Sequence, residues 1–108
     1  MQLDRGQAWW INLDPTQGAE IQKTRPCVIV AVRPIARARR TVVVVPLTTS
    51  GTPRPPLVIP VRCQAKSVYA VTDQIRAVDK ARLLTYIETL SVEDMDKIDA
   101  ALRRVLGL

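Results

Sequence analysis

Histidine and phenylalanine are absent from this chain of 108 residues, and cysteine occurs only twice. Without histidine, any phosphate chemistry must proceed without the most common acid and base of enzyme active sites. Cys27 and Cys63 lie too far apart for a zinc-ligand spacing, and no histidine could complete a site, so neither a metal nor another cofactor is expected. Cys27 lies in an apolar run and is most simply a small buried hydrophobic residue.

Aromatic residues make up only 4% of the chain, so the core must be aliphatic. Long hydrophobic runs are also missing: none approaches the length of a membrane span. Asp4 and Arg5 interrupt the N-terminus before an apolar signal segment could form. We therefore expect a cytoplasmic protein with reduced thiols and no membrane partner. The composition, 47% hydrophobic and 24% charged, is that of a globular protein, and the lack of linkers or repeats predicts one domain over residues 1–108.

Acidic residues are fewer than basic ones, ten against sixteen, and the formal net charge is +6 at pH 7. A basic domain of this size favours anionic partners, above all nucleic acid. Residues 33–40 contain four of the sixteen Lys and Arg residues and no acidic residue. This segment could be a solvated hairpin loop or a basic finger that meets a phosphate backbone. We expect a solvated loop with some electrostatic role.

Most of the chain shows patterns typical of strands and loops. The four valines at 42–45 are all β-branched and favour a strand over a helix, and such a continuous apolar strand implies burial on both faces. Pro, Ser and Thr predict a loop at 48–56. Residues 80–84 fit one helical turn, and residues 85–90 fit either a strand or a helix. Strands are expected at 7–13, 27–32, 41–47, 57–61 and 67–75.

The last segment predicts a helix. Ser91 is a good N-cap, with Asp94 at the capping-box position, and Gly107 suits the position just beyond the helix. An apolar stripe at helical spacing indicates the buried face, so its methionine belongs to the core. Many strands followed by one helix predict a mainly β fold in which the helix covers a sheet or small barrel. The stripe consists of Met95, Ile98, Leu102, Val105 and Leu106.

A polar loop at 14–26 separates the first two apolar runs and contains one Gly and two Pro residues. The loop ends by placing Arg25 at the start of a core strand. Its guanidinium is always charged and presents a planar fork of donors that suits phosphate.

Three segments stand out as a set: Arg5-Gly6-Gln7 through Trp9-Trp10-Ile11-Asn12-Leu13-Asp14-Pro15-Thr16, with Gly18, Glu20 and Thr24-Arg25-Pro26; Val43-Val44-Val45-Pro46-Leu47-Thr48-Thr49-Ser50; and Asp73-Gln74-Ile75-Arg76-Ala77-Val78-Asp79-Lys80-Ala81-Arg82-Leu83. Together with the terminal helix, they resemble the MazF/PemK/Kid-type toxins of bacterial toxin–antitoxin systems. The resemblance spans nearly the whole chain in the right order and spacing, so the set is specific although each motif alone is weak.

The resemblance implies a small SH3-like β-barrel of the CcdB/PemK type with a C-terminal helix, assembled as a homodimer. It also implies the toxin of a type II toxin–antitoxin system that acts as an mRNA interferase. Such enzymes are metal-independent endoribonucleases that cut single-stranded RNA at short sequences. In the family, the substrate's own 2′-hydroxyl attacks the phosphate and leaves a 2′,3′-cyclic phosphate and a free 5′-hydroxyl.

The family match assigns the catalytic roles to Arg25 and Thr48. Arg25 can hold the nonbridging phosphate oxygens and stabilise the charge that develops there. Because the pKa of arginine exceeds about 12, this electrostatic role suits it better than proton donation. Thr48 can accept and pass a hydrogen bond at the 2′-hydroxyl, although an unactivated hydroxyl is a weak general base.

Further residues of the matching motifs are expected to bind substrate. Asp73 aligns with a carboxylate that has an acid/base role in some members, Gln74 could read a base edge, and Arg76 could hold a phosphate. The alternative is that Asp73 and Arg76 form an ordinary surface ion pair. Glu20 could orient Arg25. The full set is Glu20, Thr24, Thr49, Ser50, Asp73, Gln74 and Arg76.

The chain also departs from the family pattern. Ala19 stands where other members have Ser or His, and Val71 stands where one branch has Arg. These changes put the base preference in doubt but leave Arg25 and Thr48 in place.

The expected partners are single-stranded RNA, a second copy of the chain and an acidic, partly disordered antitoxin, with DNA met only indirectly through a toxin–antitoxin complex. Trp9 and Trp10 face opposite ways in a strand, so we expect one in the core and the other exposed at the dimer groove, where RNA bases could stack. A gyrase poison of the CcdB type is one alternative, but it would have a Trp near the end of the helix. A catalytically inactive family member that binds only antitoxin or nucleic acid is another.

Overall fold

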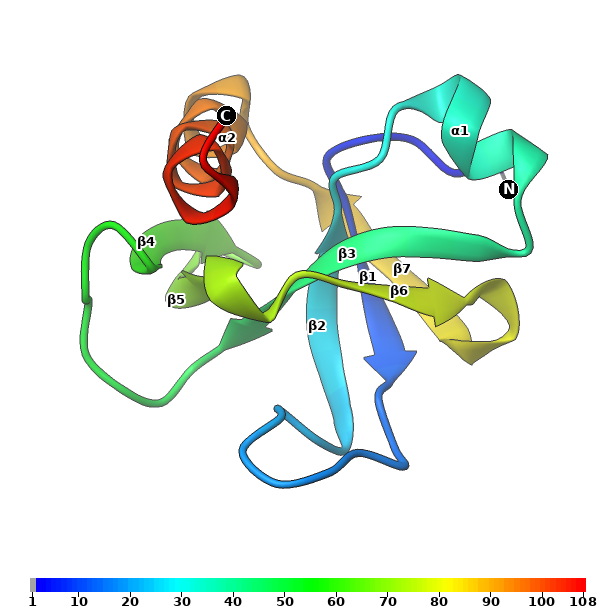
Figure 1. The fold of residues 1–108 in the computed structure, drawn as a ribbon, viewed down its shortest axis with the longest axis horizontal. Coiled ribbons are helices and arrows are strands. Elements are labelled where there is room, and N and C mark those ends of the chain that lie inside the picture. The colour runs from blue at the N-terminus through cyan, green and yellow to red at the C-terminus, as the bar shows by residue number, and fades with distance from the viewer. Residues whose placement is uncertain (1) are drawn as a thin grey trace.

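The computed structural model describes residues 2–108 as a curled half-barrel of seven strands with a helix across one side (Figure 1). This arrangement confirms the predicted mainly β fold with a C-terminal helix. None of the helices in residues 2–108 is long and apolar enough to cross a membrane. In chain order the elements are β1 (Gln7–Asn12), β2 (Thr24–Ile29), α1 (Arg33–Ala38), β3 (Thr41–Thr48), β4 (Val58–Cys63), β5 (Lys66–Val71), η1 (Thr72–Gln74), β6 (Arg76–Asp79), η2 (Lys80–Arg82), β7 (Leu83–Thr89) and α2 (Val92–Leu106).

β3 is the central strand of the sheet. The strand order is β4-β5-β3-β2-β1-β7, and β6 also pairs with β3. Val44 of β3 pairs with Ile29 of β2 on one edge and with Arg76 of β6 on the other. Further along, β3 leaves β2, and Thr48 pairs with Tyr69 of β5. One strand therefore belongs to both halves of the curled sheet.

The side chains of β3 enter two separate clusters of buried residues. Val45 and Leu47 lie in the first cluster, which also contains the buried side chains of α2. Val42 and Val44 lie in the second cluster, together with Ile29 of β2. Because successive side chains of a strand point to opposite faces, this division confirms the predicted burial of the valine run on both faces.

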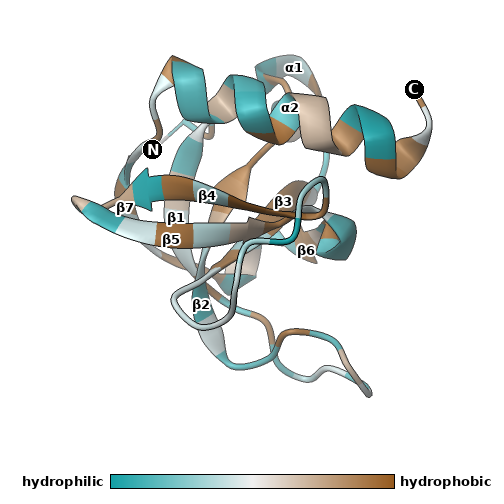
Figure 2. Cartoon of the chain, turned by 90° about the vertical axis from the view of Figure 1, so that its left-hand side faces the viewer, coloured by the Kyte–Doolittle hydropathy of each residue, from teal (hydrophilic) through white to brown (hydrophobic). Residues whose placement is uncertain are grey.

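α2 closes the first cluster and begins and ends as the sequence predicts. The Ser91 hydroxyl accepts a hydrogen bond from the amide of Asp94, and the Asp94 carboxylate accepts one from the amide of Arg62 on β4 at 2.9 Å. Gly107 ends the helix with φ +72°, a conformation that favours glycine. Figure 2 shows α2 lying across β4 and β5. Of the predicted stripe, Met95, Ile98 and Leu102 are buried, Val105 is half-buried, and Leu106 is exposed.

The prediction of a loop at 33–40 is wrong, because residues Arg33–Ala38 form the short helix α1. Pro34 stands in its first turn, where the missing N–H costs nothing. Ala36 is the buried residue of this helix and belongs to the second cluster. A six-residue helix with one small buried side chain and two arginines has little apolar periodicity, so its pattern resembles that of a loop.

Several predicted boundaries shift as well. The strand expected at 27–32 is Thr24–Ile29, and the strand expected at 67–75 ends at Val71 and continues as the single turn η1. The ambiguous residues 85–90 lie mainly in β7, and the predicted turn at 80–84 corresponds to η2. β6, the strand Arg76–Asp79, is only four residues long and was not predicted.

Candidate active site

Arg25 and Thr48 occupy equivalent positions on neighbouring strands. Arg25 pairs with Ile11 of β1, and Cys27 pairs with Pro46 of β3. Continuing this antiparallel register by two residues along each strand brings Arg25 level with Thr48. At this point β3 has already turned away from β2 towards β5. The two side chains therefore border the opening where the strands diverge, and the alternation along each strand places them on the same face of the sheet.

Arg76 lies on that face too, one strand further along. It pairs with Val44, which pairs in turn with Ile29, so the three side chains share one face of the sheet. Burial raises the pKa of the Cys27 thiol to about 12, while the charge of Arg76 acts to lower it. The Nη1 atom of Arg76 is buried without a hydrogen-bond partner. In residues 2–108 neither Arg25 nor Arg76 forms an ion pair, so the alternative of an Asp73–Arg76 surface pair is wrong.

The residues at the end of β3 form a compact turn that is held by their hydroxyl groups. The Thr48 hydroxyl accepts a hydrogen bond from the amide of Ser50 at 3.2 Å and lies 3.2 Å from the Ser50 hydroxyl. Thr49 is exposed beside them. On the facing strand, Thr24 is exposed, and the Arg25 Nε donates to the carbonyl of Gln22 at 3.2 Å. The Arg25 guanidinium therefore lies on the β2 side of the opening, and the Thr48 and Ser50 hydroxyls lie on the β3 side.

Gln74 holds the loop that joins β1 to β2. Its side-chain oxygen accepts a hydrogen bond from the amide of Ile21 at 2.7 Å, and its amide nitrogen donates to the carbonyl of Ala19 at 3.5 Å. Both ends of this side chain thus bind the backbone of the loop, and contact of Gln74 with a base stays a prediction. Ala19 takes part through its backbone, so the absence of Ser or His there leaves this contact intact.

Four of the predicted binding residues surround one pocket of about 340 Å³ beneath that loop. Glu20 lies on its loop side, and its carboxylate accepts a hydrogen bond from the amide of Gln17 at 2.7 Å. Its hydrogen bond is thus made within the loop, whereas the sequence had suggested that it orients Arg25. The pocket is lined by Ala19, Glu20, Asp73, Gln74, Ile75 and Arg76.

Both tryptophans are half-buried, which differs from the expected division into one core and one exposed ring. Trp9 packs against the second cluster and against Tyr86 edge to face, with ring centroids 5.8 Å apart. Its indole N–H donates to the side chain of Gln7 at 3.0 Å. Trp10, the next residue of the strand, points to the other face.

Replacing Gln74 with Ala should release the loop without unfolding the protein. A neutral hydrogen bond contributes about 1 kcal/mol, so we expect hydrogen exchange of the Ile21 amide to accelerate at least about fivefold. Gln74→Glu, which keeps the acceptor for Ile21, should lie between parent and Gln74→Ala. The control is Gln17→Ala, because only the backbone of Gln17 contacts Glu20. If the Ile21 amide exchanges at the same rate in Gln74→Ala as in the parent, the hydrogen bond from Ile21 to Gln74 does not hold the loop in place.

The chain was compared with protein families and with known proteins and structures. Residues 4–106 match the model of the PemK-like, MazF-like toxins of type II toxin–antitoxin systems. The endoribonuclease MazF9 of Mycobacterium tuberculosis is 31% identical over 98% of both chains. The endoribonuclease PemK of Escherichia coli is 47% identical over 49 residues, which are 45% of this chain and 37% of that protein.

The solved structures agree on the fold. MazF from Deinococcus radiodurans superposes with a TM-score of 0.89 over 100% of this chain and 99% of its own, at 18% identity. An endoribonuclease from a mycobacterial species, solved in complex with its cognate antitoxin, superposes with a TM-score of 0.79 over 99% of this chain and 95% of its own, at 27% identity. The predicted small barrel with a C-terminal helix is thereby confirmed as the fold of these proteins.

Proposed function

Because this chain belongs to the PemK-like, MazF-like toxins of type II toxin–antitoxin systems, we propose that it is such a toxin and acts as an endoribonuclease on single-stranded RNA. The observation that supports this assignment most strongly is the placement of Arg25 and Thr48 on one face of the sheet, where β2 and β3 diverge. The opening between them gives a phosphate access to a guanidinium on one side and to hydroxyls on the other.

In the proposed reaction the 2′-oxygen of the RNA attacks the adjacent phosphorus, and the bond from phosphorus to the 5′-oxygen breaks. The products are a 2′,3′-cyclic phosphate and a 5′-hydroxyl, and no metal ion takes part. Arg25 stabilises the negative charge that grows on the nonbridging oxygens. Thr48 accepts the hydrogen bond of the attacking 2′-hydroxyl, whose proton passes to solvent water. The leaving 5′-oxygen takes a proton from water, so atoms and charges balance.

The other residues around the opening bind and shape the substrate site. Arg76 provides a second guanidinium on the same face, and its unpartnered Nη1 is suited to a phosphate oxygen. Thr24, Thr49 and Ser50 offer hydroxyl groups along the opening. Gln74 fixes the position of the loop, which then limits the bases that can enter, while Glu20 and Asp73 bind substrate in the pocket they line.

A second copy of the chain completes the proposed assembly as a homodimer. A large apolar cleft runs between α1, the end of α2 and the edge of β3, and several hydrophobic residues beside it are exposed. Apolar surface of this kind on a small domain marks an interaction site. The residues concerned are Val32, Ile35, Leu106 and Leu108.

The antitoxin is the second proposed partner. The net charge of +6 suits an acidic, partly disordered segment that folds on the toxin. The mycobacterial relative was solved with its cognate antitoxin. DNA would be bound only indirectly, by the toxin–antitoxin complex and not by the toxin alone. The proposed compartment is the cytoplasm, where the free thiols of Cys27 and Cys63 stay reduced.

The test is incubation of the purified protein with a long single-stranded RNA in the presence of EDTA, followed by mapping of both new ends. We expect discrete cuts with 5′-hydroxyl and 2′,3′-cyclic phosphate ends, and unchanged rates as EDTA is increased. Cutting that stops in EDTA would refute the metal-independent reaction. Absence of cutting, with RNA or antitoxin still bound, would favour an inactive family member, and inhibition of DNA gyrase in a supercoiling assay would favour a CcdB-type poison.

A further inference from the structure

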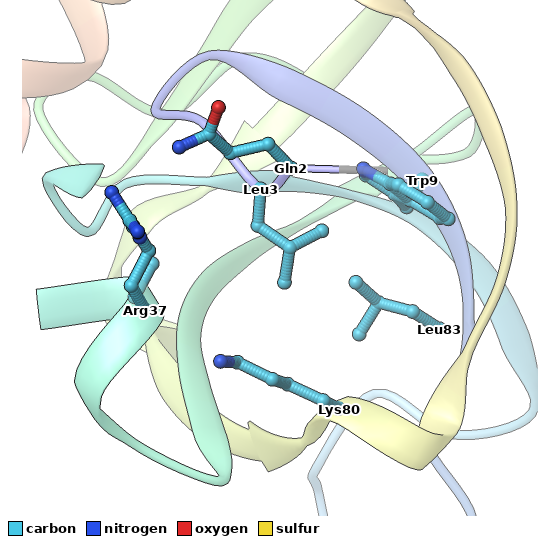
Figure 3. Close-up of a pocket in the computed structure, with 7 residues that line it drawn as sticks. Gln2, Leu3, Trp9, Arg37, Lys80 and Leu83 are labelled. Carbon is cyan, nitrogen blue, oxygen red and sulfur yellow. The ribbon is translucent and has the colours of Figure 1, made fainter. Parts of the chain in front are cut away.

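A basic pocket that the proposed reaction does not use lies between α1, η2 and the start of the chain. Its volume is about 680 Å³. Figure 3 shows Leu3 and Leu83 forming its apolar wall, with Arg37 and Lys80 on one side and Trp9 on the other. None of its lining residues is acidic. An apolar wall flanked by two cations suits a ligand that has both an anionic group and a flat apolar part.

The basic residues near this pocket divide into two groups. Arg33 is paired with Asp4, and Arg82 donates to the carbonyls of Asn12 and Asp14. In residues 2–108 neither Arg37 nor Lys80 forms an ion pair. The nearby carboxylates are also occupied: Asp4 binds Arg33, and Asp79 accepts a hydrogen bond from the amide of Ala81. The two cations of the pocket are therefore available to an external anion.

The aromatic pair beside the pocket favours a nucleic acid over an acidic peptide. Trp9 and Tyr86 pack edge to face and are both partly exposed, and the indole N–H is already bound to Gln7. The ring surfaces can therefore contribute only apolar and stacking contacts. Proteins that bind single-stranded nucleic acid combine cations along the backbone with aromatic platforms for the bases.

The pocket is also connected to the candidate active site through β1. Trp9 pairs with Cys27, and Ile11, two residues further along β1, pairs with Arg25. Two residues of a strand span about 7 Å, and neighbouring strands lie about 4.8 Å apart. Arg82 of η2 is bound to the carbonyls of Asn12 and Asp14, which fixes the turn containing Lys80 beside the end of β1. A single RNA strand could thus reach both places.

We propose that this pocket is an accessory site for single-stranded nucleic acid, in which Arg37 and Lys80 hold a backbone phosphate and a base lies against Leu3, Leu83 and the edge of Trp9. The proposal rests on the RNA nuclease proposed above and extends it to nucleotides that flank the cut. It also gives the basic segment 33–40 a specific role. The accessory site raises affinity for long strands, while the position of the cut is set at Arg25 and Thr48.

The test uses the double variant Arg37→Ala with Lys80→Ala and, as a probe, a long single-stranded DNA, which has no 2′-hydroxyl and cannot be cut by the proposed reaction. We expect affinity at low salt to fall at least about fivefold. The slope of log affinity against log salt concentration should decrease by about 0.7, because the two side chains together hold one phosphate of a single strand. The matched control is Lys66→Ala with Arg104→Ala, which removes the same charge from exposed positions on β5 and α2.

The outcomes separate this proposal from the proposed function. Equal losses of affinity and slope in the double variant and the control pair would refute the accessory site, even if the parent cuts RNA as proposed. A loss specific to Arg37 and Lys80 in a protein that cuts no RNA would refute the nuclease and support the site. Weaker binding of an acidic antitoxin with unchanged binding of single-stranded DNA would assign the pocket to a protein partner and overturn the proposal.

Discussion

Substitution of Arg25 by Ala should reduce the rate of RNA cleavage by a factor of about 10² to 10³. The guanidinium lies where β2 and β3 diverge and forms no ion pair in the described residues, so its charge is available to the phosphate. Once it is removed, no other residue of β2 has a positive charge to take over the proposed stabilisation of the pentavalent phosphorane. The measurement is single-turnover cleavage of an RNA containing one mapped cut site, with enzyme in excess.

Two further variants show whether the loss comes from the guanidinium itself. Arg25→Lys keeps the charge but loses the planar fork, so its rate should lie between those of the parent and Arg25→Ala. Lys66→Ala removes a positive charge from an exposed end of β5 and should cleave like the parent. If Arg25→Ala cuts as fast as the parent while keeping its thermal midpoint, the site assignment is wrong.

Substitution of Ile98 by Ala should lower the free energy of unfolding by about 2–5 kcal/mol. Ile98 is 0% exposed and lies in the cluster between α2 and the sheet. Removing three of its carbons leaves a cavity that the surrounding strands cannot fill without disturbing their backbone pairing. Since natural domains are stable by only about 5–15 kcal/mol, this one change would remove a large part of the total.

The control is Val92→Ala on the same helix, where the side chain is 77% exposed. It should change stability by less than about 0.5 kcal/mol. Both variants are measured by urea unfolding at one fixed protein concentration, because the stability of the proposed homodimer would depend on concentration. A similar loss in both variants would mean that α2 does not anchor the fold through its buried face.

The elements predicted correctly are those with strong local signals. The valines at 42–45 favour a strand through their own stereochemistry, and Ser91 with Asp94 and Gly107 defines both ends of α2. α1 and β6 were missed because neither shows an apolar period of its own. α1 has a single buried side chain, Ala36, and β6 becomes a strand only because β3 offers it an edge.

The candidate site shows the same limit. Motifs indicate Arg25 and Thr48, and the strand register brings these two residues level on neighbouring strands, while their catalytic roles stay a prediction. The role of Gln74 could not be predicted, because its partner Ile21 is 53 residues away in sequence and offers only a backbone amide. The difference between Arg33, which is paired, and Arg37, which is not, likewise depends on where Asp4 lies in the fold.

The branching of β3 has a consequence for engineering. Thr48 is fixed by its pairing with Tyr69 of β5, and Arg25 by its pairing with Ile11 of β1. The distance across the opening is thus set by backbone ladders, while the segments at 14–23 and 49–57 leave from its borders and lie outside the buried core. Those two segments should behave as exchangeable cassettes: transplanted from a relative with a different base preference, they would transfer that preference to this scaffold and leave the reacting groups in place.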